Sequence, residues 1–245
     1  MRLAAFLVFA LLMSACTVTT TQSTPSSRPA PEQQAQQQAV PQKLTSADSR
    51  RLAAQFENVK RRVEPVAERE CRARQPRLNC DFNIVVDTRP NQPPNAYQTV
   101  DRNGRPILAM TVGLIARARN ADELAFVMGH EAAHHIALHL DRQREHATAG
   151  ALVFGSLAQI TGGGSDAIEA ATRIGATVGA RSYSKNFELE ADALGTVITH
   201  NAGYDPVRGA EFFTRIPDPG DRFLGTHPPN SDRIKTVRRV ASELK

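Results

Sequence analysis

Two histidines one helical turn apart constrain this chain more than any other feature of its sequence. His130 and His134 lie in the stretch LAFVMGHEAAH, in which apolar residues recur at helical spacing. Asn120 and Glu123 form a capping box, so we expect a helix that begins at Asn120 and runs to about His146. Residues four apart share one face of a helix, and both imidazoles therefore point toward the same neighbouring element.

Imidazoles at this spacing can bind one Zn²⁺, at about 2.0–2.1 Å from each ring nitrogen. Glu131 is close enough to reach a water on such a metal, but it lies too far round the helix to act as a further ligand. A catalytic zinc has three protein ligands and one open position, so a third ligand must come from elsewhere. The H-E-x-x-H pattern alone is only moderately specific.

The next acidic cluster, in the predicted helix 185–201, offers that ligand. Glu188 and Asp192 are four residues apart and share a helix face, whereas Glu190 points nearly opposite. We expect Glu188 to bind the metal and Asp192 to accept a hydrogen bond from a ligand histidine, with Glu190 in solvent. The alternative is that all three acids merely solvate a helix face.

The rest of the chain predicts an α+β domain, mostly helical with a small sheet. A buried strand is expected at 82–86, and a hairpin is expected around Asn103-Gly104. Further helices are predicted at 46–75, with a kink at Pro65, and at 166–181, 185–201, 206–214 and 230–243. A glycine run at 162–164 separates two apolar helical stretches and is a candidate lid or a plain connection.

The N-terminus is typical of an exported lipoprotein. A basic start and an apolar stretch of about ten residues predict a signal peptide over 1–15. The tetrad ending at Cys16 resembles the bacterial lipoprotein box, which implies acylation of Cys16, for example with palmitate. Thr17 after it implies an outer-membrane anchor facing the periplasm. The alternative is an ordinary signal peptide with an incidental cysteine.

Residues 16–44 are rich in Ser, Thr, Pro and Gln, so we expect a disordered polar linker before a domain at 45–245. The net charge of +5 is scattered along the chain, and we predict no nucleic-acid partner. If Cys16 carries lipid, Cys71 and Cys80 remain in an oxidising compartment, and we predict that they form a disulfide.

Taken together, the motifs resemble those of the M48 zinc metallopeptidases. The matching segments are Asn95-Ala96-Tyr97, Val112-Gly113-Leu114, His130-Glu131-x-x-His134 with His139, Tyr183-Ser184-Lys185-x-x-Glu188-x-x-Ala191-Asp192, Ala202-Gly203-Tyr204-Asp205-Pro206, and Thr226-His227-Pro228-Pro229 with Arg233. Lys185 departs from the arginine that is usual there. The resemblance implies a zincin-like fold, one Zn²⁺ per chain and Glu188 as the third ligand.

It also implies a zinc endopeptidase that hydrolyses misfolded or unassembled cell-envelope proteins, with Glu131 as general base. Two alternatives stay open. The first is a chaperone-like envelope assembly lipoprotein that binds clients with little cleavage. The second is a structural zinc site in which His227 is a permanent fourth ligand. We also consider a latent enzyme in which His227 closes the open metal position. The oligomeric state is not predicted.

Two further expectations concern the surroundings of the metal. His135, His139 and His146 are expected toward another side of the metal helix, as packing or surface residues. The oxyanion donor is one of Tyr183, His200, His227 and Arg233. An extended substrate is expected to bind beside an edge strand, for which we nominate the segment 107–112.

Overall fold

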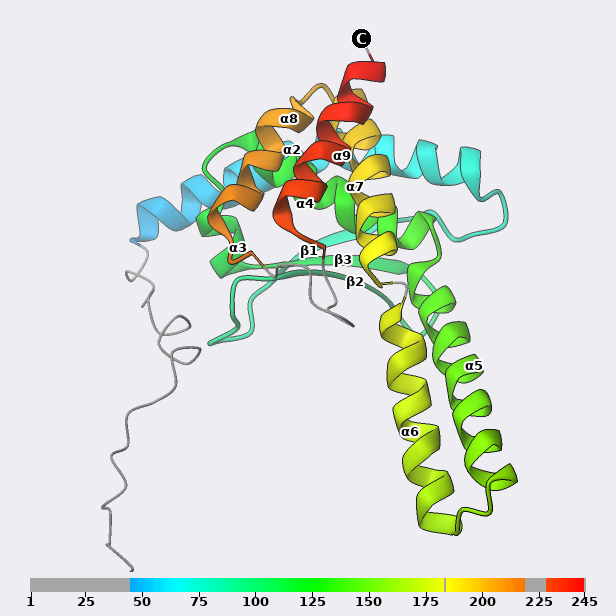
Figure 1. The fold of residues 1–245 in the computed structure, drawn as a ribbon. Coiled ribbons are helices and arrows are strands. Elements are labelled where there is room, and N and C mark those ends of the chain that lie inside the picture. Colours follow the sequence, from blue (N-terminus) through cyan, green and yellow to red (C-terminus); the bar gives the residue numbers. More distant parts are fainter. Residues whose placement is uncertain (1–44, 183, 219–227, 245) are drawn as a thin grey trace, which may run out of the picture. The chain divides into compact units, whose positions relative to one another are not determined.

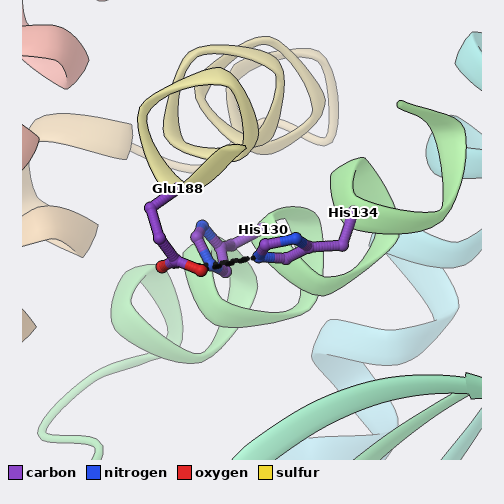
Figure 2. A group of neighbouring side chains, drawn as sticks. All are labelled: His130, His134 and Glu188. Atoms are coloured by element: carbon purple, nitrogen blue, oxygen red, sulfur yellow. Dashed lines mark hydrogen bonds and ion pairs between the residues drawn. The ribbon is translucent and has the colours of Figure 1, made fainter. Parts of the chain in front are cut away.

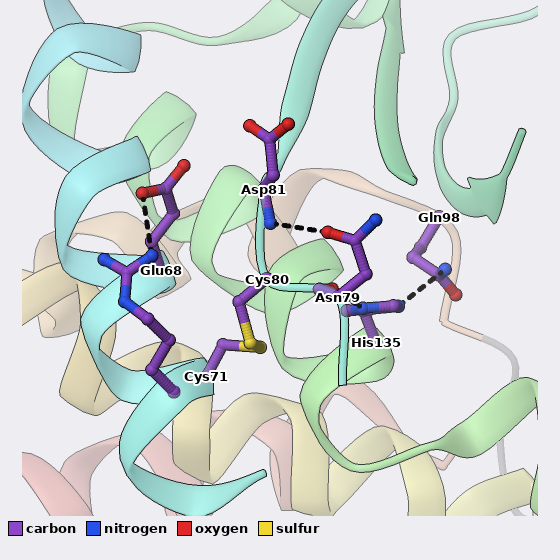
Figure 3. Close-up of a disulfide and its surroundings, with 8 residues drawn as sticks. Glu68, Cys71, Asn79, Cys80, Asp81, Gln98 and His135 are labelled. Carbon is purple, nitrogen blue, oxygen red and sulfur yellow. Dashed lines mark hydrogen bonds and ion pairs between the residues drawn. A yellow bond between two sulfur atoms is a disulfide. The ribbon is translucent and has the colours of Figure 1, made fainter. Parts of the chain in front are cut away.

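The long helix α2 (Ser46–Arg74) opens the described part of the chain and packs across the metal-histidine helix (Figure 1). Thr45 caps it, because its hydroxyl accepts a hydrogen bond from the N–H of Asp48 at 3.1 Å. The helix continues through Pro65 without interruption. The predicted disulfide is present: Cys71 in its last turns is bonded to Cys80, which ties α2 to the segment that leads into the sheet (Figure 3).

The sheet has three described strands, β1 (Asn83–Asp87), β2 (Ala96–Val100) and β3 (Pro106–Thr111), in the order β1-β3-β2. β1 runs parallel to β3, whereas β2 and β3 form the predicted antiparallel hairpin. In its turn, the Asp101 carboxylate accepts hydrogen bonds from the N–H groups of Asn103 and Arg105. β3 is therefore the central strand, and our prediction that segment 107–112 forms an edge was wrong.

After the short helix α3 (Val112–Arg117), the metal-histidine helix is α4 (Ala121–Ile136), which is almost entirely buried. As predicted, the Asn120 side chain caps it by accepting from the N–H of Glu123 at 2.9 Å. The helix does not run to His146, however. Leu138 has a left-handed backbone, with φ of 57°, and a new helix begins at the following residue. No glycine or proline marks this break, so local sequence signals could not predict it.

Helices α5 (His139–Ile160) and α6 (Ser165–Ser182) form a long antiparallel hairpin beside the rest of the domain (Figure 1). The two backbones are in close contact, because a Cβ added at Gly150 would collide with the carbonyl of Gly175. The glycine run 162–164 connects the helices at their far ends, about 33 Å along α5 from His139 at 1.5 Å per residue. It cannot cover a site near the metal histidines, so the lid hypothesis is wrong.

Helix α7 (Ser184–Asn201) carries the acidic cluster and lies against α4. The predicted helix 206–214 divides into α8 (Pro206–Gly209) and the 3₁₀ helix η1 (Ala210–Arg215). The last helix, α9 (Asn230–Glu243), has the predicted bounds and packs on α7.

The computed structural model describes residues 45–182, 184–218 and 228–244. The predicted signal peptide, Cys16 and the linker lie outside these residues, as do Tyr183 and His227. Within them the α+β prediction is confirmed: one core gathers buried side chains from α2, the sheet, α4 and η1. None of the described helices is both long and apolar enough to pass through a bilayer.

Candidate metal centre

Three potential metal ligands from two helices meet at one point. Among the described residues, His130 and His134 on α4 and Glu188 on α7 are the one group of three such side chains (Figure 2). The two Nε2 atoms are 3.0 Å apart, and they lie 3.5 Å and 3.4 Å from the carboxylate oxygens of Glu188. A tetrahedral zinc with ligands at about 2.0–2.1 Å has edges of about 3.3–3.4 Å, so this triangle fits a zinc ion.

The close approach of α4 and α7 sets this triangle. Gly129 and Gly195 face each other where the helices meet, and a Cβ at Gly195 would lie 2.9 Å from the backbone nitrogen of His130. Because neither position carries a side chain, the two backbones approach closely enough for Glu188 to reach both histidines. The helix contact therefore determines the distance between the ligand-bearing elements.

Asp192 lies one helical turn beyond Glu188 and faces His130. Its Oδ1 is 3.0 Å from His130 Nδ1, which leaves Nε2 of that ring pointing toward Glu188. Arg233 of α9 donates to both oxygens of Asp192, at 2.8 and 2.7 Å, and its guanidinium lies over the ring of Phe213 at 3.9 Å. The guanidinium of Arg233, an oxyanion candidate, is thus held by a buried carboxylate.

His134 is linked to a carboxylate through a second histidine, whereas His130 contacts Asp192 directly, and the sequence did not predict this link. Its Nδ1 is 2.8 Å from Nδ1 of His139, and Nε2 of His139 is 3.2 Å from the Glu190 carboxylate. Arg142 donates to the same carboxylate at 2.8 Å. The ring of Phe187 stacks on His139 at 4.6 Å between centroids. The position expected for His139 was wrong, because the break at the end of α4 turns this residue back toward His134. Glu190 is exposed, as expected, although it also binds His139 and Arg142.

The charges of these groups follow from their partners. Burial opposes protonation of His130, but the carboxylates of Asp192 and Glu188 outweigh it and raise the pKa of its imidazole to about 10. Burial would raise the pKa of Asp192, yet hydrogen bonds from Arg233 and His130 lower it. Burial, together with the nearby His134, lowers the pKa of His139 to about 4, so this ring is neutral at neutral pH.

Glu131 lies next to the triangle in a cleft of about 360 Å³. Its side chain is buried, and its carboxylate has no hydrogen-bond partner within residues 45–182, 184–218 and 228–244. The cleft walls are mainly apolar, and on one side they include residues of the edge strand β2. The lining includes Asn95, Tyr97, Gln98, Phe126, Phe212 and Phe213.

The remaining histidines lie elsewhere. His135 packs beneath the sheet, with Nε2 2.8 Å from the carbonyl oxygen of Asn79 and Nδ1 3.4 Å from the Gln98 amide (Figure 3). His200 is exposed in the last turn of α7 and does not line the cleft. The histidines 135, 139 and 146 form no second metal site in the part of the chain that the structure describes.

Comparison with known proteins agrees with this arrangement. Over 151 residues the chain is 36% identical to the "Putative beta-barrel assembly-enhancing protease" of Vibrio cholerae serotype O1. The aligned segment covers 56% of this chain and 31% of that protein. Over 139 residues it is 28% identical to the "Beta-barrel assembly-enhancing protease" of Escherichia coli O157:H7, covering 51% of this chain and 28% of that protein.

The chain thus spans less than a third of the length of these curated relatives. The match to the peptidase family M48 extends further along the chain, over residues 53–241. This segment contains both ligand-bearing helices, the edge strand and most of α9. Because the match covers most of the sequence, the chain belongs to peptidase family M48, a family of metallopeptidases.

Proposed function

We propose that this chain is a zinc-dependent endopeptidase. His130, His134 and Glu188 would hold one Zn²⁺, with a fourth position open to the cleft. The observation that carries the proposal is the near-equilateral triangle of ligand atoms, with edges of 3.0–3.5 Å, beside the buried carboxylate of Glu131. A structural zinc would not need such a carboxylate in an open cleft.

A zinc ion held by these three residues would act as a Lewis acid, which would polarise the scissile carbonyl and make water more acidic. Glu131 accepts the proton of the attacking water as general base. It then delivers this proton to the departing amine as general acid. The carboxylate is suited to both steps because no described side chain hydrogen-bonds it.

Asp192 and His139 orient the two ligand histidines. Asp192 accepts the Nδ1–H of His130, and Arg233 fixes the position of Asp192. His139 accepts the Nδ1–H of His134 and donates its own Nε2–H to the Glu190 carboxylate. Each contact fixes the tautomer in which Nε2 is free for the metal, and such contacts commonly raise metal affinity about 10- to 100-fold.

We assign substrate binding to β2 rather than to β3. β2 pairs on one side with β3, and its residues Tyr97 and Gln98 line the cleft. An extended polypeptide could add to the other side of this strand, where no strand of the described residues pairs, through main-chain hydrogen bonds. Such pairing selects unfolded segments over particular side chains, which suits misfolded or unassembled clients.

The cellular setting completes the proposal. We propose a lipoprotein with a signal peptide at 1–15, lipid on Cys16, a polar linker at 16–44 and a peptidase domain at 45–245, anchored in the outer membrane and facing the periplasm. The names of the two curated relatives, both proteases that enhance beta-barrel assembly, support clients from the cell envelope.

A Glu131→Gln variant tests the proposal. It keeps the shape of the side chain but removes the base, so zinc content measured by elemental analysis should stay at one per chain. Cleavage of an unfolded substrate such as casein should fall by about 10²- to 10⁴-fold. Cleavage by wild-type protein should stop in a chelator and return with zinc. If purified protein containing zinc binds casein without cleaving it, the chaperone-like alternative replaces the endopeptidase.

A further inference from the structure

The far half of α5 exposes a row of large aliphatic side chains, which we call the α5 apolar face. It consists of Leu152, Val153, Leu157 and Ile160, whose exposed fractions are 65%, 63%, 59% and 83%. At 100° per residue these four side chains lie within about 140° of the helix circumference. They therefore gather on one side of the helix, with the exposed Ser156 among them.

The packing of the hairpin explains why these residues point outward. Gly150 and Gly155 of α5 face Gly175 and Thr172 of α6, and a Cβ at either glycine would collide with α6. Small residues thus occupy much of the contact between the two helices, although Phe154 of α5 also lies against Gly175. This arrangement, with small residues inside and large aliphatic ones outside, is typical of helix pairs in lipid rather than in water.

The outer face of α6 is mainly polar. It carries exposed polar and charged residues, among them Asp166, Glu169, Arg173 and Thr177, with Ile174 as an exposed apolar neighbour. The hairpin is therefore amphipathic as a unit, with an apolar α5 side and a polar α6 side. An amphipathic element of this kind lies in the plane of a membrane surface, with its apolar side facing the acyl chains.

The chemistry of the α5 apolar face favours lipid over protein as its partner. Between Glu145 and Asp166 the chain has no charged residue. The four side chains are aliphatic, the neighbouring Phe154 is 37% exposed, and this surface lacks the Trp, Tyr and Arg residues that anchor protein interfaces. Fully burying each such side chain stabilises by about 1.5–3 kcal/mol, so exposure of four of them to water is costly.

We propose that the α5 apolar face binds a phospholipid bilayer surface, with its side chains at the boundary between headgroups and acyl chains. The proposed lipid on Cys16 would bring a bilayer within reach, since the 28 residues of segment 17–44 span up to about 90–100 Å when extended. A single lipid chain binds membranes only weakly, and a second contact makes the attachment stable. This inference does not depend on the zinc chemistry.

The chain contains no tryptophan, which allows a direct test. Leu157→Trp places an indole in the α5 apolar face, and Thr177→Trp places one on the polar side of the same hairpin. Neither variant changes a charge or a buried side chain. The full-length chain is mixed with vesicles of phosphatidylethanolamine and phosphatidylglycerol, with and without brominated acyl chains, and far-ultraviolet circular dichroism confirms the fold.

We expect the emission of Leu157→Trp to shift to the blue and to be quenched by the brominated chains, while Thr177→Trp shows neither change. Equal behaviour of the two variants would overturn the proposal. A blue shift without vesicles that grows with protein concentration would also overturn it, because the face would then bind a second copy. Since casein cleavage is not the readout, failure here leaves the proposed peptidase activity untouched.

Discussion

The Nδ1 atoms of His134 and His139 lie 2.8 Å apart, so one ring must donate to the other. If His134 presents Nε2 to a metal, its Nδ1 carries the proton and His139 accepts it. His139 then carries its own proton on Nε2, which faces the Glu190 carboxylate at 3.2 Å. The three residues therefore define one self-consistent set of proton positions.

Replacing His139 should weaken zinc binding. His139→Leu removes the acceptor for the Nδ1–H of His134, and we expect a loss of about 10- to 100-fold in zinc affinity. His139→Asn should recover most of it, because the amide oxygen occupies nearly the position of Nδ1. Competition with a chromophoric chelator measures both variants. Wild-type affinity in the leucine variant would show that the contact does not support the ligand.

Zinc affinity should also depend steeply on pH. The pKa of His130 is raised to about 10, so below that pH its imidazole carries a proton that the metal must displace. We expect about a tenfold gain in affinity per pH unit between pH 7 and pH 9, with about one proton released per zinc.

The matched control is Asp192→Asn, which removes a carboxylate that raises this pKa. In that variant the pKa of His130 should be lower, so the affinity should rise less steeply between pH 7 and pH 9 than in the wild type. Chelator competition across the pH range compares the two proteins. A wild-type curve that is already flat above pH 7 would contradict the prediction.

Gly195→Ala should loosen the contact between α4 and α7. The added Cβ would lie 2.9 Å from the backbone nitrogen of His130, so the helices must separate. We expect a loss of about 1–3 kcal/mol in the free energy of unfolding, together with weaker zinc binding. Gly164→Ala is the control, because a Cβ there meets no atom within 4 Å. Urea denaturation of both variants measures the difference; equal stability would count against the close contact.

His227→Ala addresses the latent-enzyme hypothesis, which remains a prediction from sequence. If His227 closes the open metal position at rest, its removal should raise casein cleavage several-fold without changing zinc content. If it is a permanent fourth ligand, removal should instead release zinc and lower the unfolding temperature. A loss of cleavage with zinc content and stability unchanged would exclude both roles.

The sequence determined the parts of the site that depend on helical periodicity. His130 and His134 are one turn apart, as are Glu188 and Asp192, and any α-helix at these positions places each pair on one face. The capping residues of α4 likewise predicted the start of that helix, and the bounds of α9 were also predicted from the sequence. These features are local, because they require only the repeat of the helix and a hydrogen bond within one turn.

Only the tertiary structure decided the rest. The break at Leu138, which turns His139 back to His134, carries no glycine or proline signal, so the surrounding packing must impose its left-handed backbone. The central place of β3 depends on its parallel pairing with β1, in which Asn83 lies opposite Ile107. The outward direction of Leu157 follows from glycines that let α5 and α6 touch. In each case the deciding contact joins residues whose proximity exists only in the folded chain.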